Sequence, residues 1–191
     1  MRYWMILLIG LFLAGCYESN DLLLDPAAAR QPIATGKDWT YGSGDRRYHA
    51  RLTAKPDGWY DYAEAHLDAK GTEGPWRTHT VVLNYLTTAN GYDVFVYGTY
   101  NRNDSAYMYG LIVVGKNGFW QTVMPNCDPA NADAKWLDAD TDAATGAGAK
   151  IKAIDDFERV CHFTTREQLF AALRSVMVRP EFWSRVKTAG R

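Results

Sequence analysis

Three pairs of strand-forming segments, each joined by a short turn that contains glycine, constrain the fold of this chain most. The second turn holds Asn90-Gly91, the strongest short-range signal for a β-hairpin, because both residues accept the positive φ angles of a tight turn. In the first turn, Pro56 presets φ and Gly58 accepts a positive value. The paired segments are residues 48–54 and 59–67, residues 78–88 and 92–100, and residues 107–114 and 119–124. We therefore expect three antiparallel hairpins.

The aromatic content also favours a fold built mainly of strands. Aromatic residues make up 14% of the chain, with 12 tyrosines and 7 tryptophans, and they fall mainly between Trp39 and Trp136. Such residues fit pleated, half-buried positions. In residues 92–100 both alternating faces are apolar or aromatic, which predicts a central strand covered on both sides. The pattern predicts an antiparallel sheet of about seven strands, strongly curved or folded into a sandwich.

The clearest helical signals lie near the C-terminus. Thr164 and Glu167 have the spacing of a capping box, in which each side chain bonds the backbone N–H of the other residue. Pro180 ends this helix and suits the first turn of a second one. The fold class is therefore predicted as α+β, with one or two C-terminal helices packed on the sheet. Their apolar stripes are Leu169, Leu173, Val176 and Met177, then Phe182, Trp183 and Val186.

The N-terminus carries a short apolar stretch that ends in Leu13-Ala14-Gly15-Cys16. Arg2 precedes this stretch, and residues 3–13 have the length of the apolar region of a signal peptide. A membrane-spanning helix needs about twenty apolar residues, and Glu18 follows too soon for that. The two small residues before the cysteine allow an extended peptide to lie in a protease cleft.

This ending resembles the lipobox of bacterial lipoproteins. The resemblance implies that residues 1–15 are a lipoprotein signal peptide and that Cys16 becomes a lipidated N-terminus, with acyl chains such as palmitate. Several acyl chains anchor a protein almost permanently, whereas a single chain binds reversibly. Lipoproteins of the inner membrane commonly carry Asp after the cysteine, whereas here that residue is Tyr17. The resemblance thus implies an outer-membrane protein that faces the periplasm, in preference to the inner membrane or the cell surface.

Residues 16–37 are expected to form a flexible tether between the lipid and the sheet. They contain two prolines, one glycine and no sustained periodicity. In an alternative interpretation, the three leucines at positions 22–24 pack on the domain. Residues 38–191 then form a single periplasmic α+β domain, since this length supports one core. The net charge of −1 argues against nucleic acid as a partner and leaves the lipid at Cys16 as the contact with the membrane.

Cys127 and Cys161 form an even pair in a chain exported to an oxidising compartment. A disulfide between them is therefore expected. A catalytic alternative is a Cys161 thiolate activated by the neighbouring His162. Adjacent residues of a strand point to opposite faces, which argues against this alternative.

No motif in the sequence specifies a catalytic residue, a resident metal or a cofactor. Asp138, Asp140 and Asp142 have the alternating carboxylate spacing of a calcium-binding loop. The match ends at Ala143 and Ala149, where such a loop has a glycine and a bidentate glutamate. The preferred interpretation is a solvated acidic loop.

The predicted function is a non-catalytic binding or structural role in the cell envelope. An aromatic surface would recognise a protein or an envelope polymer such as peptidoglycan, since aromatic side chains combine a large apolar area with a polar tip. The alternative is an enzyme that acts on envelope glycans with a carboxylate pair, drawn from Asp61 and Glu64 or from Asp155, Asp156 and Glu158. The candidate binding residues are Trp59, Tyr60, Tyr97, Tyr100, Trp120 and Trp136.

Overall fold

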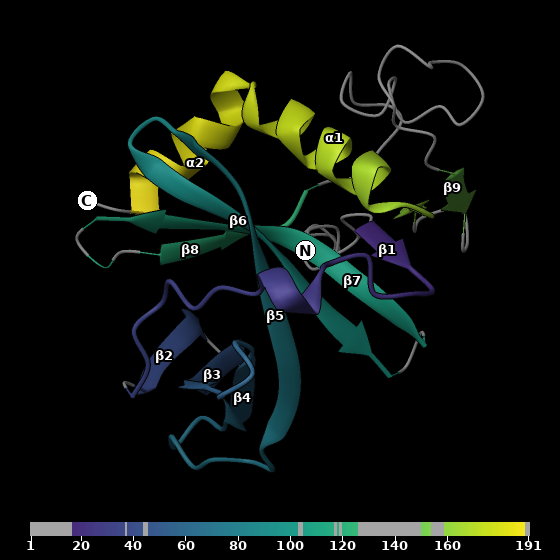
Figure 1. Cartoon of the computed structure of the whole chain (residues 1–191). Helices are drawn as coiled ribbons and strands as arrows, with labels where there is room; N and C mark the ends of the chain where they lie inside the picture. Colours follow the sequence, from purple (N-terminus) through teal and green to yellow (C-terminus); the bar gives the residue numbers. More distant parts are fainter. Residues whose placement is uncertain are drawn as a thin grey trace, which may run out of the picture.

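The computed structural model describes residues 17–36, 38–43, 46–102, 105–116, 118, 120–125, 150–153 and 159–189. Their strands form one ten-stranded mixed sheet, and two C-terminal helices lie over one of its faces (Figure 1). The predicted α+β class is thereby confirmed.

Seven consecutive strands, β2 to β8, run as an antiparallel meander in which each strand pairs with the next. The three predicted hairpins are confirmed as β3–β4, β5–β6 and β7–β8. Asn90 and Gly91 have φ angles of 51° and 81°, as the tight turn between β5 and β6 requires. The strands are β2 (Asp38–Ser43), β3 (Arg46–Ala54), β4 (Tyr60–Leu67), β5 (Arg77–Ala89), β6 (Tyr92–Asn101), β7 (Ala106–Gly115) and β8 (Trp120–Val123).

Three further strands extend the sheet beyond β7. β1 (Tyr17–Ser19) and β8 both pair with the same edge of β7, at different residues. The other side of β1 pairs with β10 (Arg159–His162), and β10 pairs in turn with β9 (Lys150–Ala153). The β1–β10 pairing is parallel, so the sheet is mixed and not wholly antiparallel as predicted. The predicted strong curvature or sandwich is also wrong. The strands form one open layer, and helices, not a second sheet, cover one of its faces.

The C-terminal helices follow the predicted apolar stripes. α1 (Arg166–Met177) and α2 (Pro180–Ala189) bury the stripe residues against the sheet. The capping box uses Thr165 and Gln168, one residue later than predicted, and the Gln168 N–H donates to Thr165 Oγ1 at 3.3 Å. The shift arises because strand pairing continues past β10, where the Phe163 N–H donates to the carbonyl of Glu18 at 2.8 Å. The chain is therefore still extended at residue 164.

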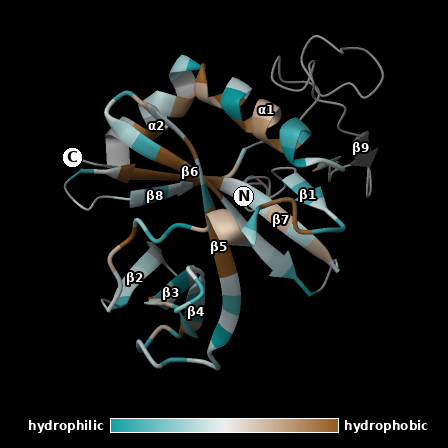
Figure 2. Ribbon diagram, in the orientation of Figure 1, coloured by the Kyte–Doolittle hydropathy of each residue, from teal (hydrophilic) through white to brown (hydrophobic). Residues whose placement is uncertain are grey.

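Apolar clusters cover both faces of β6, which confirms it as a central strand. Val94 and Val96 belong to the cluster between the sheet and the helices, whereas Phe95 belongs to a second cluster on the opposite face. Figure 2 shows the apolar stretches of β5 and β6 that supply these clusters. The second cluster comprises Ile33, Leu52, Tyr60, Leu83, Phe95 and Ile112.

The predicted flexible tether is wrong for residues 17–36, which are part of the folded domain. Tyr17 is 1% exposed, and both Leu24 and Ile33 are buried in the apolar clusters. The segment runs from β1 through a short 3-10 helix, η1 (Pro26–Ala28), and then passes across the sheet beside β5 (Figure 1). The alternative interpretation, with leucines at positions 22–24 packed on the domain, agrees with the structure.

Two buried polar side chains of the sheet hold this segment by its backbone. The Tyr109 hydroxyl on β7 accepts the N–H of Leu23 at 2.8 Å. The Asn84 amide on β5, which is 0% exposed, bonds both the N–H and the carbonyl of Asp25, at 2.8 and 2.9 Å. Detaching the segment would leave these buried groups without partners, which is costly. The hydrogen bonds therefore fix residues that lack any regular periodicity.

Candidate functional site

A row of aromatic rings lies along the sheet face that points away from the helices. Tyr41 and Tyr48 stack with ring centroids 5.3 Å apart and an interplanar angle of 20°. Trp39 on β2 meets Trp120 on β8 edge to face at 5.2 Å, although these strands are not neighbours in the sheet. The other two ring contacts of the row are 5.4 and 6.3 Å. We call this set the aromatic row: His66, Tyr48, Tyr41, Tyr62, Trp39 and Trp120.

The register of three neighbouring strands explains why these rings share a face. Trp39 and Tyr41 are two residues apart on β2, and alternate residues of a strand point to the same side. Tyr41 pairs directly with Tyr48 of β3, which pairs with His66 of β4. Residues directly opposite each other in paired strands also share a face. The backbone pairing thus aligns rings that are scattered in the sequence.

Glu64 lies at the centre of the row and accepts hydrogen bonds from two of its phenols. The Tyr41 and Tyr62 hydroxyls donate to Glu64 Oε2 at 2.5 and 2.7 Å, and the two hydroxyl oxygens are 3.0 Å apart. Burial, followed by the hydrogen bond to Glu64, raises the pKa of Tyr41 to about 12. Burial, followed by the hydrogen bond to Tyr41, also raises the pKa of Tyr62. Both phenols therefore remain protonated donors at neutral pH.

The row can offer a ligand ring faces, hydroxyl groups and one carboxylate. Tyr41 is 39% exposed, whereas Tyr48, Tyr62 and Trp39 are half-buried. Their orientation is fixed by the stacking and by the hydrogen bonds to Glu64, so little side-chain entropy is lost when a ligand binds. The arrangement suits a flat, partly apolar and partly polar ligand better than a deeply enclosed one.

The opposite face of the same strands carries a charged cluster, the His49 network. Arg51 makes a bidentate hydrogen-bonded pair with Asp38 at 2.9 and 2.7 Å. His49 Nδ1 lies 2.5 Å from Glu73 Oε1, and its Nε2 lies 3.5 Å from Asp38 Oδ2. Trp76 donates from its indole to Glu73 at 3.0 Å, and the Arg51 guanidinium lies 5.1 Å from the Trp76 ring centroid. These contacts join the β4–β5 loop to β2 and β3.

The electrostatics of the His49 network indicate a structural role. Hydrogen bonding from Arg51 lowers the pKa of the Asp38 carboxyl, and hydrogen bonding from His49 lowers the pKa of Glu73. Each acidic group is thus satisfied by a basic group of the same network. Glu73 and Trp76 approach His49 only through the fold of the loop, so the network leaves no pattern in the sequence.

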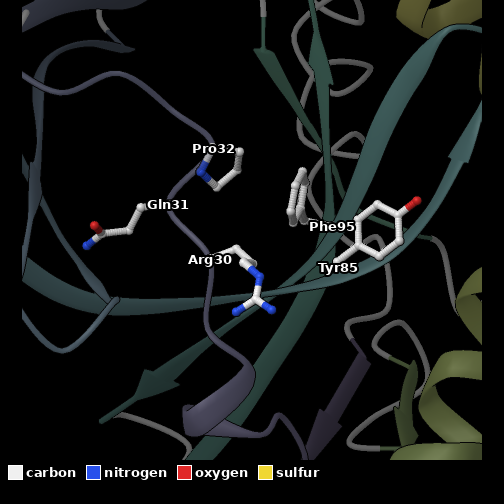
Figure 3. A pocket seen from close by; sticks show the side chains of 5 residues that line it. All are labelled: Arg30, Gln31, Pro32, Tyr85 and Phe95. Atoms are coloured by element: carbon white, nitrogen blue, oxygen red, sulfur yellow. The ribbon is translucent and has the colours of Figure 1, made fainter.

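A small open pocket of about 300 Å³ lies on the same face as the aromatic row, between the N-terminal segment and β5–β6 (Figure 3). Tyr85 and Phe95 form one wall, with their rings 5.7 Å apart. In Figure 3, Gln31 points away from the other labelled side chains. Its amide donates to the carbonyls of Lys55 and Trp59 in the β3–β4 turn, so it serves the fold. Among the described residues that line the pocket, Arg30 is the only charged one.

The predicted binding aromatics do not form one surface. Tyr60 is 1% exposed, and its hydroxyl bonds the backbone of Ile33 at 3.0 and 3.1 Å, so it holds the N-terminal segment. Trp59 packs against the cluster beneath the helices. Tyr97 and Tyr100 are three residues apart on β6 and therefore point to opposite faces.

Trp120 is the one predicted binding residue that belongs to the aromatic row. Sequence reasoning missed Trp39, Tyr41, Tyr48 and Tyr62. The available signal was the i, i+2 spacing of Trp39 with Tyr41, which places both rings on one face of a strand.

The predicted carboxylate pair of Asp61 and Glu64 is not brought together. These residues are three apart on β4, so their side chains point to opposite faces of the sheet. Asp61 accepts a hydrogen bond from the Thr80 hydroxyl at 3.3 Å and lies 4.0 Å from Lys55 Nζ. The other proposed acids, Asp155, Asp156 and Glu158, lie outside the described residues.

Cys161 is disulfide-bonded, and its partner lies outside the described residues. Its 0% exposure and this bond rule out the predicted alternative of a Cys161 thiolate activated by His162. His162 instead lies 3.4 Å from Glu18 of β1. The remaining predicted site residues lie outside the described part of the chain: Cys16, Cys127, Trp136, Asp138, Asp140 and Asp142.

No protein-family model matches the chain, and comparisons with curated proteins and with solved structures found no match. Within the described ranges, no group of three or more His, Cys, Asp or Glu side chains is placed to hold a metal ion. No helix among the described residues is long and apolar enough to cross a membrane. Any functional conclusion must therefore rest on the geometry of the side chains.

Proposed function

We propose that this protein is a lipid-anchored envelope protein that binds a glycan polymer, such as peptidoglycan, through the aromatic row. The lipid would be attached at Cys16, in the outer membrane, with the domain facing the periplasm. The observation that supports binding is the row itself: preoriented rings beside two phenol donors and the Glu64 carboxylate. Aromatic faces pack on apolar surfaces, while phenol hydroxyls meet polar groups. A sugar ring presents both kinds of surface.

The distribution of exposed apolar residues favours a narrow ligand over a second protein. A stable protein interface needs about 800 Å² of surface from each partner. The large exposed apolar side chains of the described residues are dispersed over different strands, a loop and the helix junction: Tyr41, Trp76, Tyr85, Tyr100, Met124 and Val178. A polymer chain that lies along one row of rings does not need a broad apolar patch.

The position of the acidic groups favours binding over hydrolysis. Glycoside hydrolysis needs two carboxyl groups facing each other across the scissile bond. Glu64 lies on the aromatic face, whereas Asp61, the nearest acid on the same strand, lies on the opposite face. Glu64 also accepts two phenol hydrogen bonds, which suits a role in holding the rings.

Cosedimentation of the purified protein with peptidoglycan sacculi tests this proposal. The wild type should pellet with the sacculi, and Tyr41→Ala should weaken binding by about 0.5–1.5 kcal/mol, or roughly two- to tenfold in Kd. Tyr41→Phe keeps the ring and removes the donor to Glu64, so it separates stacking from hydrogen bonding. Tyr85→Ala is the matched control, because Tyr85 is 49% exposed but lies outside the row. Equal pelleting of Tyr41→Ala and wild type, or capture of a protein by this face instead, would refute glycan binding by the row.

A further inference from the structure

The folded N-terminal segment has a consequence for how the domain meets the membrane. We infer that the domain rests directly on the lipid bilayer, with the end of β8 around Met124 at the bilayer surface. The inference rests on the proposed lipid at Cys16. The surface that contacts this end of β8 is a phospholipid bilayer. The contacts that support this placement all involve residues from Tyr17 onward.

The chain is fixed from its first described residue. Tyr17 is 1% exposed and pairs with Tyr109 on one side and with Cys161 on the other. The Tyr109 hydroxyl also bonds the side chain of Ser19 at 2.8 Å and donates to the carbonyl of Asp21 at 2.9 Å. An extended residue spans at most about 3.6 Å. A lipid on the residue that precedes Tyr17 therefore cannot lie far from the sheet.

The register of β7 identifies the neighbouring surface. β1 and β8 occupy the same edge of β7, where Tyr17 pairs with Tyr109 and Val123 pairs with Leu111. Two residues along a strand correspond to roughly 7 Å. The end of β8 thus lies beside the start of β1, and whatever surface receives the lipid must also approach residues 123–125.

The chemistry of this end of β8 suits a bilayer surface. Met124 is an apolar side chain with 40% of its surface exposed, and residues 120–125 carry no charge. The Tyr97 hydroxyl bonds the Met124 sulfur, so a phenol stands beside the thioether. An apolar side chain next to a tyrosine is a combination found at membrane–water interfaces. No charged group of residues 120–125 would need to lose water there.

This placement adds to the proposed function, because it fixes the distance between the aromatic row and the bilayer. Trp120 of the aromatic row is three residues from Val123 along β8, a distance of about 10 Å. The row would begin close to the bilayer and lead away from it through Trp39 and Tyr41. A ligand would then be held next to the membrane and not at the end of a swinging tether.

Depth-dependent fluorescence quenching tests the inference on the full, lipidated protein in vesicles. A fluorophore at Met124→Cys should be quenched by nitroxide-labelled phospholipids at least threefold more than the same fluorophore at Asp57→Cys. Asp57 is an exposed residue of the β3–β4 turn and serves as the matched control. A second variant with ten Gly/Ser residues inserted between Cys16 and Tyr17 adds a mean reach of about 17 Å. It should remain on the vesicles but lose the extra quenching at position 124.

Vesicle flotation distinguishes a failure of the lipid anchor from a failure of direct contact between the domain and the bilayer. Failure of the wild type to float with vesicles would overturn the lipid anchor and, with it, this inference. Flotation with equal quenching at positions 57 and 124, or with quenching that survives the insertion, would overturn direct seating on the bilayer while the anchor stands. Flotation with selective quenching at position 124, abolished by the insertion, supports it.

Discussion

On one face of the sheet the two C-terminal helices and the first part of the N-terminal segment cover the core, whereas on the other face the chain around Ile33 and a row of aromatic rings take their place. The helix face is closed by side-chain packing, with Leu169, Leu173 and Val186 each at 0% exposure. The open face depends on directed hydrogen bonds, between Tyr60 and the backbone of Ile33 and from two phenols to Glu64. Packing therefore stabilises the helix face, whereas hydrogen bonds on the open face hold the rings where a ligand can reach them.

The largest effect is expected on the helix face. Leu173→Ala should lower the free energy of unfolding by about 2–5 kcal/mol, because it leaves a cavity in a fully buried site. Urea unfolding monitored by tryptophan fluorescence measures this change. A loss below about 1 kcal/mol would mean that the helices contribute much less to the core than the sheet does.

A smaller loss is expected when the N-terminal segment is released at Asp25, which Asn84 of β5 holds on the helix face, beside Arg166 of α1. Asn84→Ala removes the amide that bonds the backbone of Asp25 and should cost about 1–3 kcal/mol. Limited proteolysis should then cut within residues 25–33 before the domain unfolds globally. Unchanged protection of this segment would show that Leu24, on the helix face, and Ile33, on the open face, hold it by packing alone.

A helix cap provides a test that is local to the helix face. Thr165→Ala should cost about 1 kcal/mol, because the Thr165 hydroxyl accepts the Gln168 N–H at the start of α1. Thr164→Ala is the control, since it removes only an exposed hydrogen bond from the Thr164 hydroxyl to the Gln168 side chain, and it should cost less than about 0.5 kcal/mol. Thermal unfolding of both variants checks this order. A larger loss of stability in Thr164→Ala than in Thr165→Ala would indicate that Thr164 is the N-cap residue, as predicted from the sequence.

The smallest effect concerns the tyrosines of the open face, and it is a loss of stability that begins only above pH 10. The pKa of Tyr41 is raised from 10.0 to about 12, so the neutral phenol is favoured in the folded protein. The associated stability is fully present below pH 10 and is lost as pH rises through about 12.

Spectrophotometric titration of tyrosinate absorbance should therefore show a late phase that is smaller by two tyrosines in a Tyr41→Phe, Tyr62→Phe double variant. The late titration of Tyr17, Tyr60 and Tyr109 should remain, because burial raises the pKa of these three groups as well. A late phase of unchanged amplitude in the double variant would mean that Glu64 does not organise the row.

Local signals predicted much of the regular structure. Asn90-Gly91 forms the tight turn, because only residues that tolerate positive φ close it, and Val94 alternates with Phe95 between the two apolar clusters. The apolar stripe from Leu169 to Met177 forms α1, because its period matches that of a helix. These features depend on neighbours close in sequence, so the sequence alone carries them.

The candidate site was predicted less well, for the opposite reason. Tyr60 and Tyr62 are equally aromatic, yet Tyr60 is buried beneath the N-terminal segment while Tyr62 joins the aromatic row. The choice between them depends on Ile33, which is distant in sequence. In the same way, His49 acquires its partner Glu73 only because the β4–β5 loop folds back on β3.

The sequence by itself determined the hairpins, the helices, the α+β class and the lipobox-like ending at Cys16, because each is a pattern of adjacent or periodic residues. Only the tertiary structure decided that residues 17–36 belong to the domain and that the aromatic row lies on one face. These outcomes depend on pairings between distant segments, such as Tyr17 with Tyr109 and Trp39 with Trp120. Buried polar groups fix such pairings, since their free energy is favourable only when the distant partner is in place.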